Sequence, residues 1–311
     1  MELKYKLPEY IVMARMSSKI RILVEGKDDR GHVLNLFGLF MPKAKLKVDV
    51  ALDIVGDCNA TRTNNRAKIE KIHAHCKDKK NYQRLFFLCD REFRNFNVAD
   101  VIEDSSIDHE VDGNMSWTLG HSIENYFLSP LMLSDGFRYL SGSGRKTQAL
   151  ELFSNIFDDS MRKIAAVTLA AREMNCAGYP VGIIRWSEIS FPDGAIDLGL
   201  RKGVEQNQFM DSFISVYESY LSIVARTDSE ICARLCRGHT AVVILQRLFS
   251  ACLYAAGKVV DEETATYDAN LFNNLPETCI SSALSEAWVK TVAEGQSPYP
   301  RPLVELVSSV A

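Results

Sequence analysis

Three acidic residues in the first third of the sequence stand where a metal-dependent enzyme needs them. Glu25 directly follows the run KIRILV (19–24), and Asp90 directly follows LFFLC (85–89), with Glu92 close behind. Carboxylates gathered in one cleft repel one another, so such a cluster is stable mainly when cations or protons lie between them. Mg²⁺ prefers oxygen ligands and commonly takes one or two protein carboxylates, while substrate phosphates complete its shell. These residues therefore predict a magnesium site that binds substrate phosphates.

The runs before these acids are typical of strands in a parallel sheet. KIRILV is rich in β-forming residues, and the pair Asp28-Asp29 that follows can cap a helix. Apolar residues alternate over 48–54 and recur at helical spacing over 67–76, which indicates a second strand and helix. LFFLC is apolar throughout, as expected of a strand covered on both faces. Strands alternating with helices form right-handed βαβ units, and ligands collect beyond the carboxyl ends of such strands, where Glu25 and Asp90 lie.

The side chains after LFFLC are expected to alternate. Asp90 and Glu92 then point to the same side of an extended segment, and Arg91 is directed elsewhere. An acid after a strand often just caps the next helix, and for any single one of the three this is about as plausible as catalysis. Two strand ends that both terminate in acid favour the catalytic interpretation. Lys27 is suited to stabilise transition-state charge, and a solvent-exposed lysine in a turn explains it equally well.

A basic segment between Arg62 and Arg84 is the candidate for holding substrate. It contains Arg66, Lys68, Lys71, Lys77, Lys79 and Lys80 against only Glu70 and Asp78. The whole chain has a formal charge of −4, so nucleic acid must be attracted by a local patch. We expect substrate phosphates to meet Arg62, Arg66, Lys68 and Lys71, and the alternative is an ordinary solvated helix face. Phosphate contacts position a nucleic acid without reading its sequence.

The motifs RILVEGKDD (21–29) and FFLCDREF (86–93) resemble those of the Toprim family, in which a glutamate follows the first strand and an Asp-x-Asp-like pair follows the third. Glu92 stands where that pair has its second aspartate. The segment HSIENYFLSP (121–130) is similar to an element of Toprim proteins associated with OLD-like nucleases. This resemblance makes Glu124 a fourth metal ligand. His121, just before it, is a candidate general base.

The sequence looks most similar to the Toprim nuclease subunits (AriB) of PARIS anti-phage defence systems. That resemblance implies an endonuclease effector held in check by an ABC-type ATPase sensor subunit (AriA-like) and released when a phage protein is sensed. It implies cleavage of host nucleic acid, with RNA favoured over DNA and tRNA as the leading candidate. It also implies two Mg²⁺ or Mn²⁺ ions, one to activate a water and one to neutralise charge on the leaving oxygen. The competing interpretation is a catalytically silent Toprim module that binds within a nucleoprotein or ATPase assembly. A topoisomerase or primase is a weaker third choice because those enzymes require extra domains.

The chain's 311 residues suit two domains. We predict an N-terminal extension over 1–18, a Toprim-like α/β domain with a parallel sheet over 19–140, and a mainly α-helical domain over 145–311. The helical domain is expected to contact substrate or partner, or to form a homodimer in the active state. Gly142 and Gly144 mark the joint, and the clearest helical segments are 209–226, 240–257 and 279–294. Another helix begins at Ser129-Pro130, and the tail SPYPRP (297–302) is expected to be an extended arm.

The remaining composition indicates a cytoplasmic protein without a membrane anchor. The start of the sequence has no uninterrupted apolar core, so it does not read as a secretion signal. The most apolar stretch, 240–257, is broken by Gln246 and Arg247, which argues against a membrane span. The eight cysteines are expected to stay as thiols and fill cores. Cys232, Cys236 and His239 have the spacing of half a zinc site, but buried helical cysteines are favoured because a second ligand pair is missing.

Overall fold

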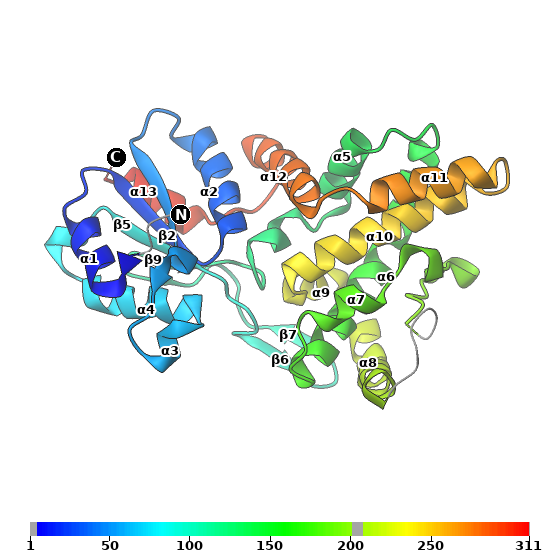
Figure 1. Cartoon of the computed structure of the whole chain (residues 1–311), viewed down its shortest axis with the longest axis horizontal. Coiled ribbons are helices and arrows are strands. Elements are labelled where there is room, and N and C mark those ends of the chain that lie inside the picture. The colour runs from blue at the N-terminus through cyan, green and yellow to red at the C-terminus, as the bar shows by residue number, and fades with distance from the viewer. Residues whose placement is uncertain (1–4, 201–207, 311) are drawn as a thin grey trace. The chain divides into compact units, whose positions relative to one another are not determined.

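The computed structural model describes residues 5–200 and 208–310, and its contacts divide the chain into two units (Figure 1). Unit 1 comprises Met1–Arg91, Ser106–Ile123 and Val289–Ala311. Unit 2 comprises Glu92–Ser105 and Glu124–Trp288. This division differs from the linear boundaries expected at 18/19 and 140/145, because both ends of the chain contribute to unit 1.

Unit 1 is built on a mixed sheet of mostly parallel strands. The strand order is β3 (Leu46–Val50), β2 (Ile20–Val24), β5 (Leu85–Cys89), β9 (Met115–Trp117) and β8 (Val111–Asp112). The first four strands run parallel, and β8 runs antiparallel to β9. Every residue of β2 and β5 is buried, as their apolar sequences require of central strands. The expected α/β fold is therefore present, with an antiparallel edge that the sequence did not indicate.

Helices cover both faces of this sheet (Figure 1). Along β5 the side chains alternate, so Leu85, Phe87 and Cys89 share one face. That face packs against α1 (Leu7–Arg15) and α4 (Asn65–Cys76) in one continuous core. On the rest of the sheet, α2 (Lys27–Phe40) contacts β2 and β3, and α13 (Arg301–Ser308) contacts β5 and β9. The helix expected after Glu25 begins at Lys27, and the carboxylate of Asp29 in its first turn accepts a hydrogen bond from the Gly26 backbone N–H at 2.6 Å.

Both terminal segments are parts of unit 1 rather than appendages. Tyr5–Lys6 forms β1 and pairs in parallel with β4 (Ile54–Val55), and Leu7 and Tyr10 of α1 are almost fully buried. The tail SPYPRP does not continue as an extended arm. Residues 301–308 form α13, since proline is tolerated in the first turn of a helix, and the side chains of Leu303 and Val307 are completely buried.

The second predicted strand is shorter than its alternating pattern suggested. The strand β3 ends at Val50, a 3-10 turn covers Ala51–Asp53, and β4 follows. The alternating residues over 48–54 therefore belong to two strands that are separated by a turn. This turn places the Ala51 carbonyl at the carboxyl end of the sheet, where it meets a lysine from α4 as described below.

Unit 2 is mainly helical. Its helices are α5 (Pro130–Leu140), α6 (Lys146–Glu173), α7 (Tyr179–Ile183), α8 (Gln208–Arg226), α9 (Ser229–Leu235), α10 (Gly238–Gly257), α11 (Glu262–Asn273) and most of α12 (Glu277–Ala293). They confirm the helical segments predicted over 209–226, 240–257 and 279–294. A short hairpin, β6 (Phe96–Val98) with β7 (Ile102–Asp104), belongs to the same unit. Ser129 caps α5 as expected, since its hydroxyl accepts a hydrogen bond from the Met132 backbone N–H at 3.3 Å.

The glycines expected at the joint between domains lie elsewhere in the architecture. Gly142 and Gly144 connect α5 to α6, and both helices belong to unit 2. The chain instead passes between the units near residues 91, 105, 123 and 288. Repeated crossings of this kind cannot be read from a single glycine-rich stretch.

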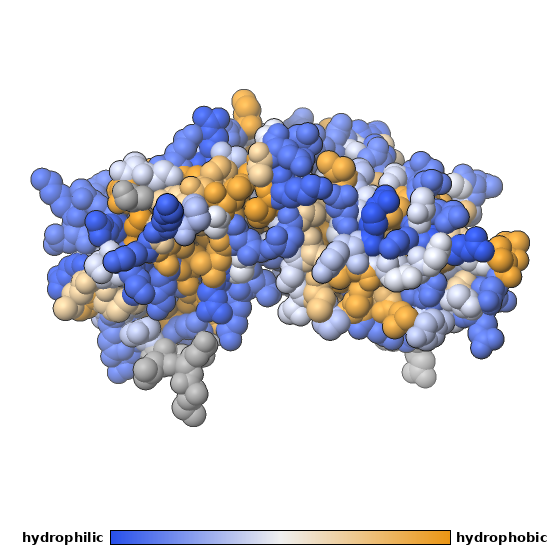
Figure 2. Space-filling model, turned by 90° about the horizontal axis from the view of Figure 1, so that it is seen from above, coloured by the Kyte–Doolittle hydropathy of each residue, from blue (hydrophilic) through white to orange (hydrophobic). Residues whose placement is uncertain are grey.

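The most apolar helix, α10, passes a length and composition test for a membrane span, but 78% of its most apolar window is buried inside the protein. The polar residues at its centre are hydrogen-bonded inside the protein. The Gln246 side chain donates hydrogen bonds to backbone carbonyls at the end of α11, and Arg247 donates to the carbonyls of Val181 and Ile184. The helix is thus a core element, and the fold is compatible with a soluble protein. Figure 2 shows apolar side chains interspersed with hydrophilic ones on the face that it draws.

Candidate active site at the carboxyl edge of the sheet

The structure brings Glu25 and Asp90 together. Each follows the last residue of a buried strand, and β2 and β5 are direct parallel neighbours. The Glu25 carboxylate accepts a hydrogen bond from the Asp90 backbone N–H, with 3.1 Å between Oε1 and N. Both residues are half-buried, so each remains within reach of solvent. Two acids therefore meet at the edge where open α/β sheets bind their ligands.

The backbone of Glu25 is held by a buried polar chain. The Asn65 side-chain amide, at the start of α4, donates to the Glu25 carbonyl at 3.2 Å. The Asn65 side-chain oxygen accepts in turn from the ammonium of Lys68 at 2.9 Å, and the same ammonium donates to the Ala51 carbonyl at 3.1 Å. Lys68 is only 4% exposed. The end of β2, the turn after β3 and the start of α4 are thereby linked through one lysine.

A second set of bonds fixes the chain after Asp90. The Arg91 backbone N–H donates to the Thr118 hydroxyl at 2.9 Å, and this hydroxyl donates to the Gly120 carbonyl at 2.8 Å. Thr118 follows β9, the other neighbour of β5, and its own N–H donates to the Cys89 carbonyl. Arg91 is 1% exposed, so it is directed into the protein. The position of Asp90 is thus defined from both adjacent strands.

Asp90 and Glu92 do not share the extended segment on which the same-side prediction depended. Glu92 has a left-handed backbone, with φ of +52°, and it opens a turn that leads into β6. Side-chain alternation holds only while the backbone is extended, so it ends at Arg91. Glu92 is exposed and belongs to unit 2, as does the half-buried Glu124. Their role as metal ligands stays a prediction.

The other predicted site residues of unit 1 lie on segments that leave the same sheet edge. Lys27 is the first residue of α2 and is exposed. His121 comes shortly after β9 and is 8% exposed, so a substrate has little access to its imidazole in this conformation.

The basic residues expected to bind phosphates are largely engaged with the protein itself. The Arg66 guanidinium pairs with Glu70 at 3.0 Å, and the Lys71 ammonium pairs with Asp57 at 2.7 Å. Lys68 is buried, as described above, and so it holds the fold together rather than facing a nucleic acid. Arg62 is exposed at the end of the short helix α3 (Asn59–Arg62). A run of basic residues in a sequence does not show which of them are buried, because one face of a helix packs against the core and the other is exposed to solvent.

The two acids affect the electrostatics of the strand end. The pKa of the Cys89 thiol is raised well above its usual range, first by burial and then by the negative charges of Glu25 and Asp90. A nearby negative field of this sign attracts cations. Because its pKa is raised, the Cys89 thiol stays neutral in the core.

The donor set of this edge fits a hard divalent cation. Among residues 5–200 and 208–310, no group of three or more His, Cys, Asp or Glu side chains is gathered as a metal site. Mg²⁺ needs no such group, since it commonly takes one or two carboxylates while water and substrate phosphates complete the octahedron. Glu25 and Asp90 supply that number of oxygen ligands. The cysteines that had half a zinc spacing, Cys232 and Cys236, are completely buried thiols, as expected.

Two residues of the site were missed by the sequence interpretation. Asn65 is the second of two consecutive asparagines before a helix, and such residues normally suggest only a cap. Its neighbour Asn64 does cap α4, while Asn65 reaches across to Glu25. Thr118 directly follows a buried strand, which was a readable signal for a position at the sheet edge.

No model of a known protein family matches the chain, and no curated protein matches it either.

Proposed function

We propose that unit 1 is the catalytic part of a metal-dependent nuclease of the Toprim type, with Glu25 and Asp90 as its metal ligands. One observation supports this most strongly: two acids follow adjacent parallel strands at the ligand-binding edge of an α/β sheet, and the carboxylate of Glu25 accepts a hydrogen bond from the backbone N–H of Asp90 at 3.1 Å. A sheet needs no pair of carboxylates there, and their mutual repulsion costs free energy unless a cation is bound.

The residues of the chain have distinct parts in this proposal. Glu25 and Asp90 would hold a divalent cation, which when bound would polarise a phosphoryl oxygen and lower the pKa of a water. Asn65 and Lys68 fix the backbone of Glu25, and Thr118 fixes the backbone after Asp90. Lys27, which is exposed at the start of α2, would meet the negative charge that develops on the phosphate. Glu92, Glu124 and His121 complete the proposed set as two further ligands and a general base.

The biological context that we propose rests on the resemblance of RILVEGKDD, FFLCDREF and HSIENYFLSP to Toprim subunits of PARIS systems. In that context the protein is a cytoplasmic toxin with two Mg²⁺ or Mn²⁺ ions, and it cleaves host RNA, with tRNA as the favoured substrate. An ABC-type ATPase sensor holds it in check, and release produces an active homodimer. Unit 2 then contributes the surface for substrate, sensor or second subunit.

The decisive experiment compares Glu25→Gln and Asp90→Asn with wild type and with Asp28→Asn. Asp28 is an exposed acid close to Glu25 in the sequence and has no part in the proposed site, so its substitution matches the loss of one charge. Gln at position 25 keeps an oxygen that accepts the Asp90 N–H and removes the charge that binds metal. Each protein is expressed in bacteria, and total RNA and plasmid DNA are inspected for fragments; purified proteins are assayed with Mg²⁺ and with a chelator.

We expect cleavage and toxicity from wild type and Asp28→Asn, loss of both in the two site variants, and no cleavage when the chelator is present. Loss of one catalytic ligand is expected to lower the rate by about a hundredfold or more. Cleavage that survives both substitutions contradicts the proposal. RNA that stays intact beside nicked plasmid moves the substrate to DNA.

The competing function is a catalytically silent module that binds within a larger nucleoprotein or ATPase assembly. One observation favours this function. The Glu25 carboxylate accepts a hydrogen bond from the Asp90 backbone N–H, so it has a structural role even without a metal. This module predicts that Glu25→Gln changes no activity. Isothermal titration with Mn²⁺ separates the two functions, because the silent module binds no ion at positions 25 and 90.

A further inference from the structure

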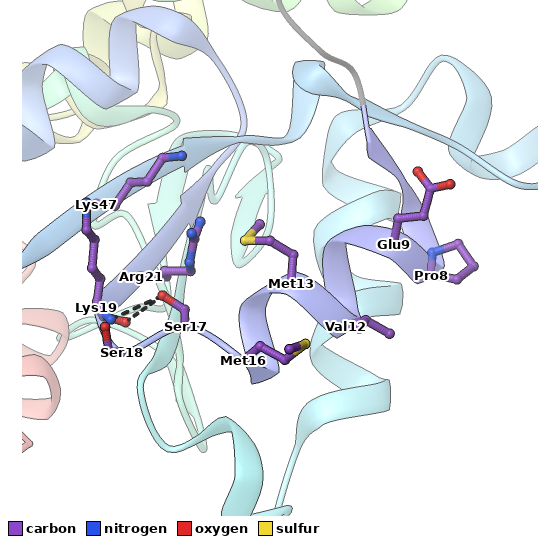
Figure 3. A pocket seen from close by; sticks show the side chains of 10 residues that line it. All are labelled: Pro8, Glu9, Val12, Met13, Met16, Ser17, Ser18, Lys19, Arg21 and Lys47. Carbon is purple, nitrogen blue, oxygen red and sulfur yellow. Dashed lines mark hydrogen bonds between the residues drawn. The ribbon is translucent and has the colours of Figure 1, made fainter.

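An open groove of about 820 Å³ lies on unit 1, away from the carboxyl edge, where the end of α1 meets the beginning of β2 (Figure 3). One wall is apolar and consists of Val12, Met13 and Met16 from α1 and its C-cap. The other wall is cationic and consists of Lys19, Arg21 and Lys47. Figure 3 shows Met13 reaching from α1 toward Arg21, with Glu9 at the opposite end of the groove.

The apolar wall is unusually exposed for its residue types. Met16 is 78% exposed and Val12 is 45% exposed, while Met13 packs partly against the core beneath. Methionine side chains are flexible and polarisable, so they adapt to different apolar groups and are frequent at surfaces that bind varied partners. An exposed apolar wall beside charged residues marks an interaction site more often than chance.

The cationic wall has more positive charge than its neighbours neutralise. Asp49 is bound by Arg21 at 2.6 Å and by the Tyr10 hydroxyl at 3.1 Å, and the Lys47 ammonium lies 3.5 Å from the same carboxylate. One carboxylate therefore serves two cations. Within the described residues, the Lys19 ammonium makes no hydrogen bond or ion pair, and Glu9 accepts from the Lys6 backbone N–H instead. The groove thus offers one apolar side and an excess of positive charge on the other.

We propose that this groove binds a segment of a partner protein in which apolar side chains are flanked by aspartate or glutamate. Charge complementarity supports an acidic segment, since Lys19 would gain the carboxylate that it lacks, and Lys47, which shares Asp49 with Arg21, would gain a second one. The apolar wall supports aliphatic or methionine side chains next to those acids. Nucleic acid fits less well because the lining contains no aromatic side chain on which a base could stack.

An anionic membrane fits less well too. The chain carries a formal charge of −4, which opposes adsorption to a negatively charged surface. The proposal stands independently of the nuclease function, because it uses no residue of the carboxyl edge.

The test is a display selection of short random peptides on the purified full-length protein, followed by fluorescence polarisation with the most enriched peptide. Two variants remove the two walls separately: Met16→Ser, and the double substitution Lys19→Glu with Lys47→Glu. Their controls, Leu34→Ser and Lys43→Glu, change exposed residues of unit 1 outside the groove, and Leu34 is 45% exposed, as Val12 is. All changed side chains are exposed, so the variants are expected to fold, which circular dichroism checks.

We expect an enriched pattern of apolar residues beside Asp or Glu, with affinity about tenfold weaker in each groove variant and unchanged in both controls. Added salt is expected to weaken binding to wild type and to have little effect on the charge-reversed variant. The proposal is overturned if no peptide is enriched, if the enriched pattern lacks acids, or if the groove variants bind as wild type does. Stronger binding through these residues to phosphatidylglycerol vesicles or to a single-stranded oligonucleotide also overturns it.

Discussion

Lys68 has two competing explanations: it stabilises the fold around the site, or it binds substrate phosphates as the sequence suggested. In the structure its ammonium is buried and bonds to the Ala51 carbonyl and to the side-chain oxygen of Asn65. Replacement by methionine keeps the length and apolar stem of the side chain and removes the charge. If the lysine stabilises the fold, Lys68→Met must lower the free energy of unfolding in the absence of any nucleic acid.

The expected magnitude follows from these two bonds. A hydrogen bond to a charged group contributes about 1.5–3 kcal/mol, and a buried acceptor left without its donor costs about 1–3 kcal/mol. Against this, the methionine no longer buries an ammonium, which is worth several kcal/mol. We therefore expect a net loss of about 1–3 kcal/mol. A double-mutant cycle with Asn65→Ala is expected to give a coupling energy of about 1–2 kcal/mol, because the two side chains are in direct contact.

The assay is urea unfolding followed by circular dichroism, in buffer free of metal and nucleic acid. The control is Lys71→Met, one turn further along α4, because Lys71 is exposed and pairs with Asp57 at the surface, so its loss should change stability little. The reasoning is refuted if Lys68→Met is as stable as this control and the coupling energy is below about 0.5 kcal/mol. Weaker nucleic-acid binding at unchanged stability would restore Lys68 as a phosphate contact.

Three further predictions concern the rest of the protein. Gln246→Leu is expected to destabilise the protein by about 2–4 kcal/mol in urea unfolding, because its amide carries two donors that satisfy buried backbone carbonyls; the exposed Gln148→Leu is its control, and equal stability of the two would contradict the core assignment of α10. Gly56→Ala is expected to cost about 3 kcal/mol by the same measurement, since its Cβ would lie 2.3 Å from the Thr61 carbonyl oxygen. Glu277 raises the pKa of His239, so this pair stabilises the protein below the usual histidine pKa of 6.5, and the contribution disappears as pH rises through the raised value. Thermal melts of wild type and Glu277→Gln should therefore differ by up to about 1 kcal/mol near pH 5.5 and converge near pH 8.5.

The parallel part of the fold could be predicted because the burial of apolar residues largely determines where its strands lie. Runs such as LFFLC are buried on both faces, so their apolar letters alone indicate central strands, and the acid that follows marks the strand end. The helical segments of unit 2 were readable for a similar reason, since each keeps an apolar stripe over several turns. Local sequence and tertiary environment agree in these segments.

The errors arose where distant parts of the chain decide the structure. Pro300 and Pro302 suggested an extended arm, yet α13 forms because Leu303 and Val307 bury completely in unit 1. The backbone at Glu92 has a left-handed conformation, which favours small or polar residues. The sequence Arg91-Glu92-Phe93 does not predict this conformation. The burial of Lys68 depends on the Ala51 carbonyl, which the turn after β3 presents. None of these partners is near in the sequence.

The hydrogen bond between Asp90 and Glu25 also determines which substitution is informative. Alanine at position 25 removes the proposed metal ligand and the acceptor of a backbone N–H together, so loss of activity would not distinguish catalysis from a displaced strand end. Glutamine keeps the acceptor and removes only the charge. If Glu25→Gln retains its stability and loses its metal-dependent activity, the carboxylate is required for its charge; if it retains both, the carboxylate is there to hold the chain at Asp90.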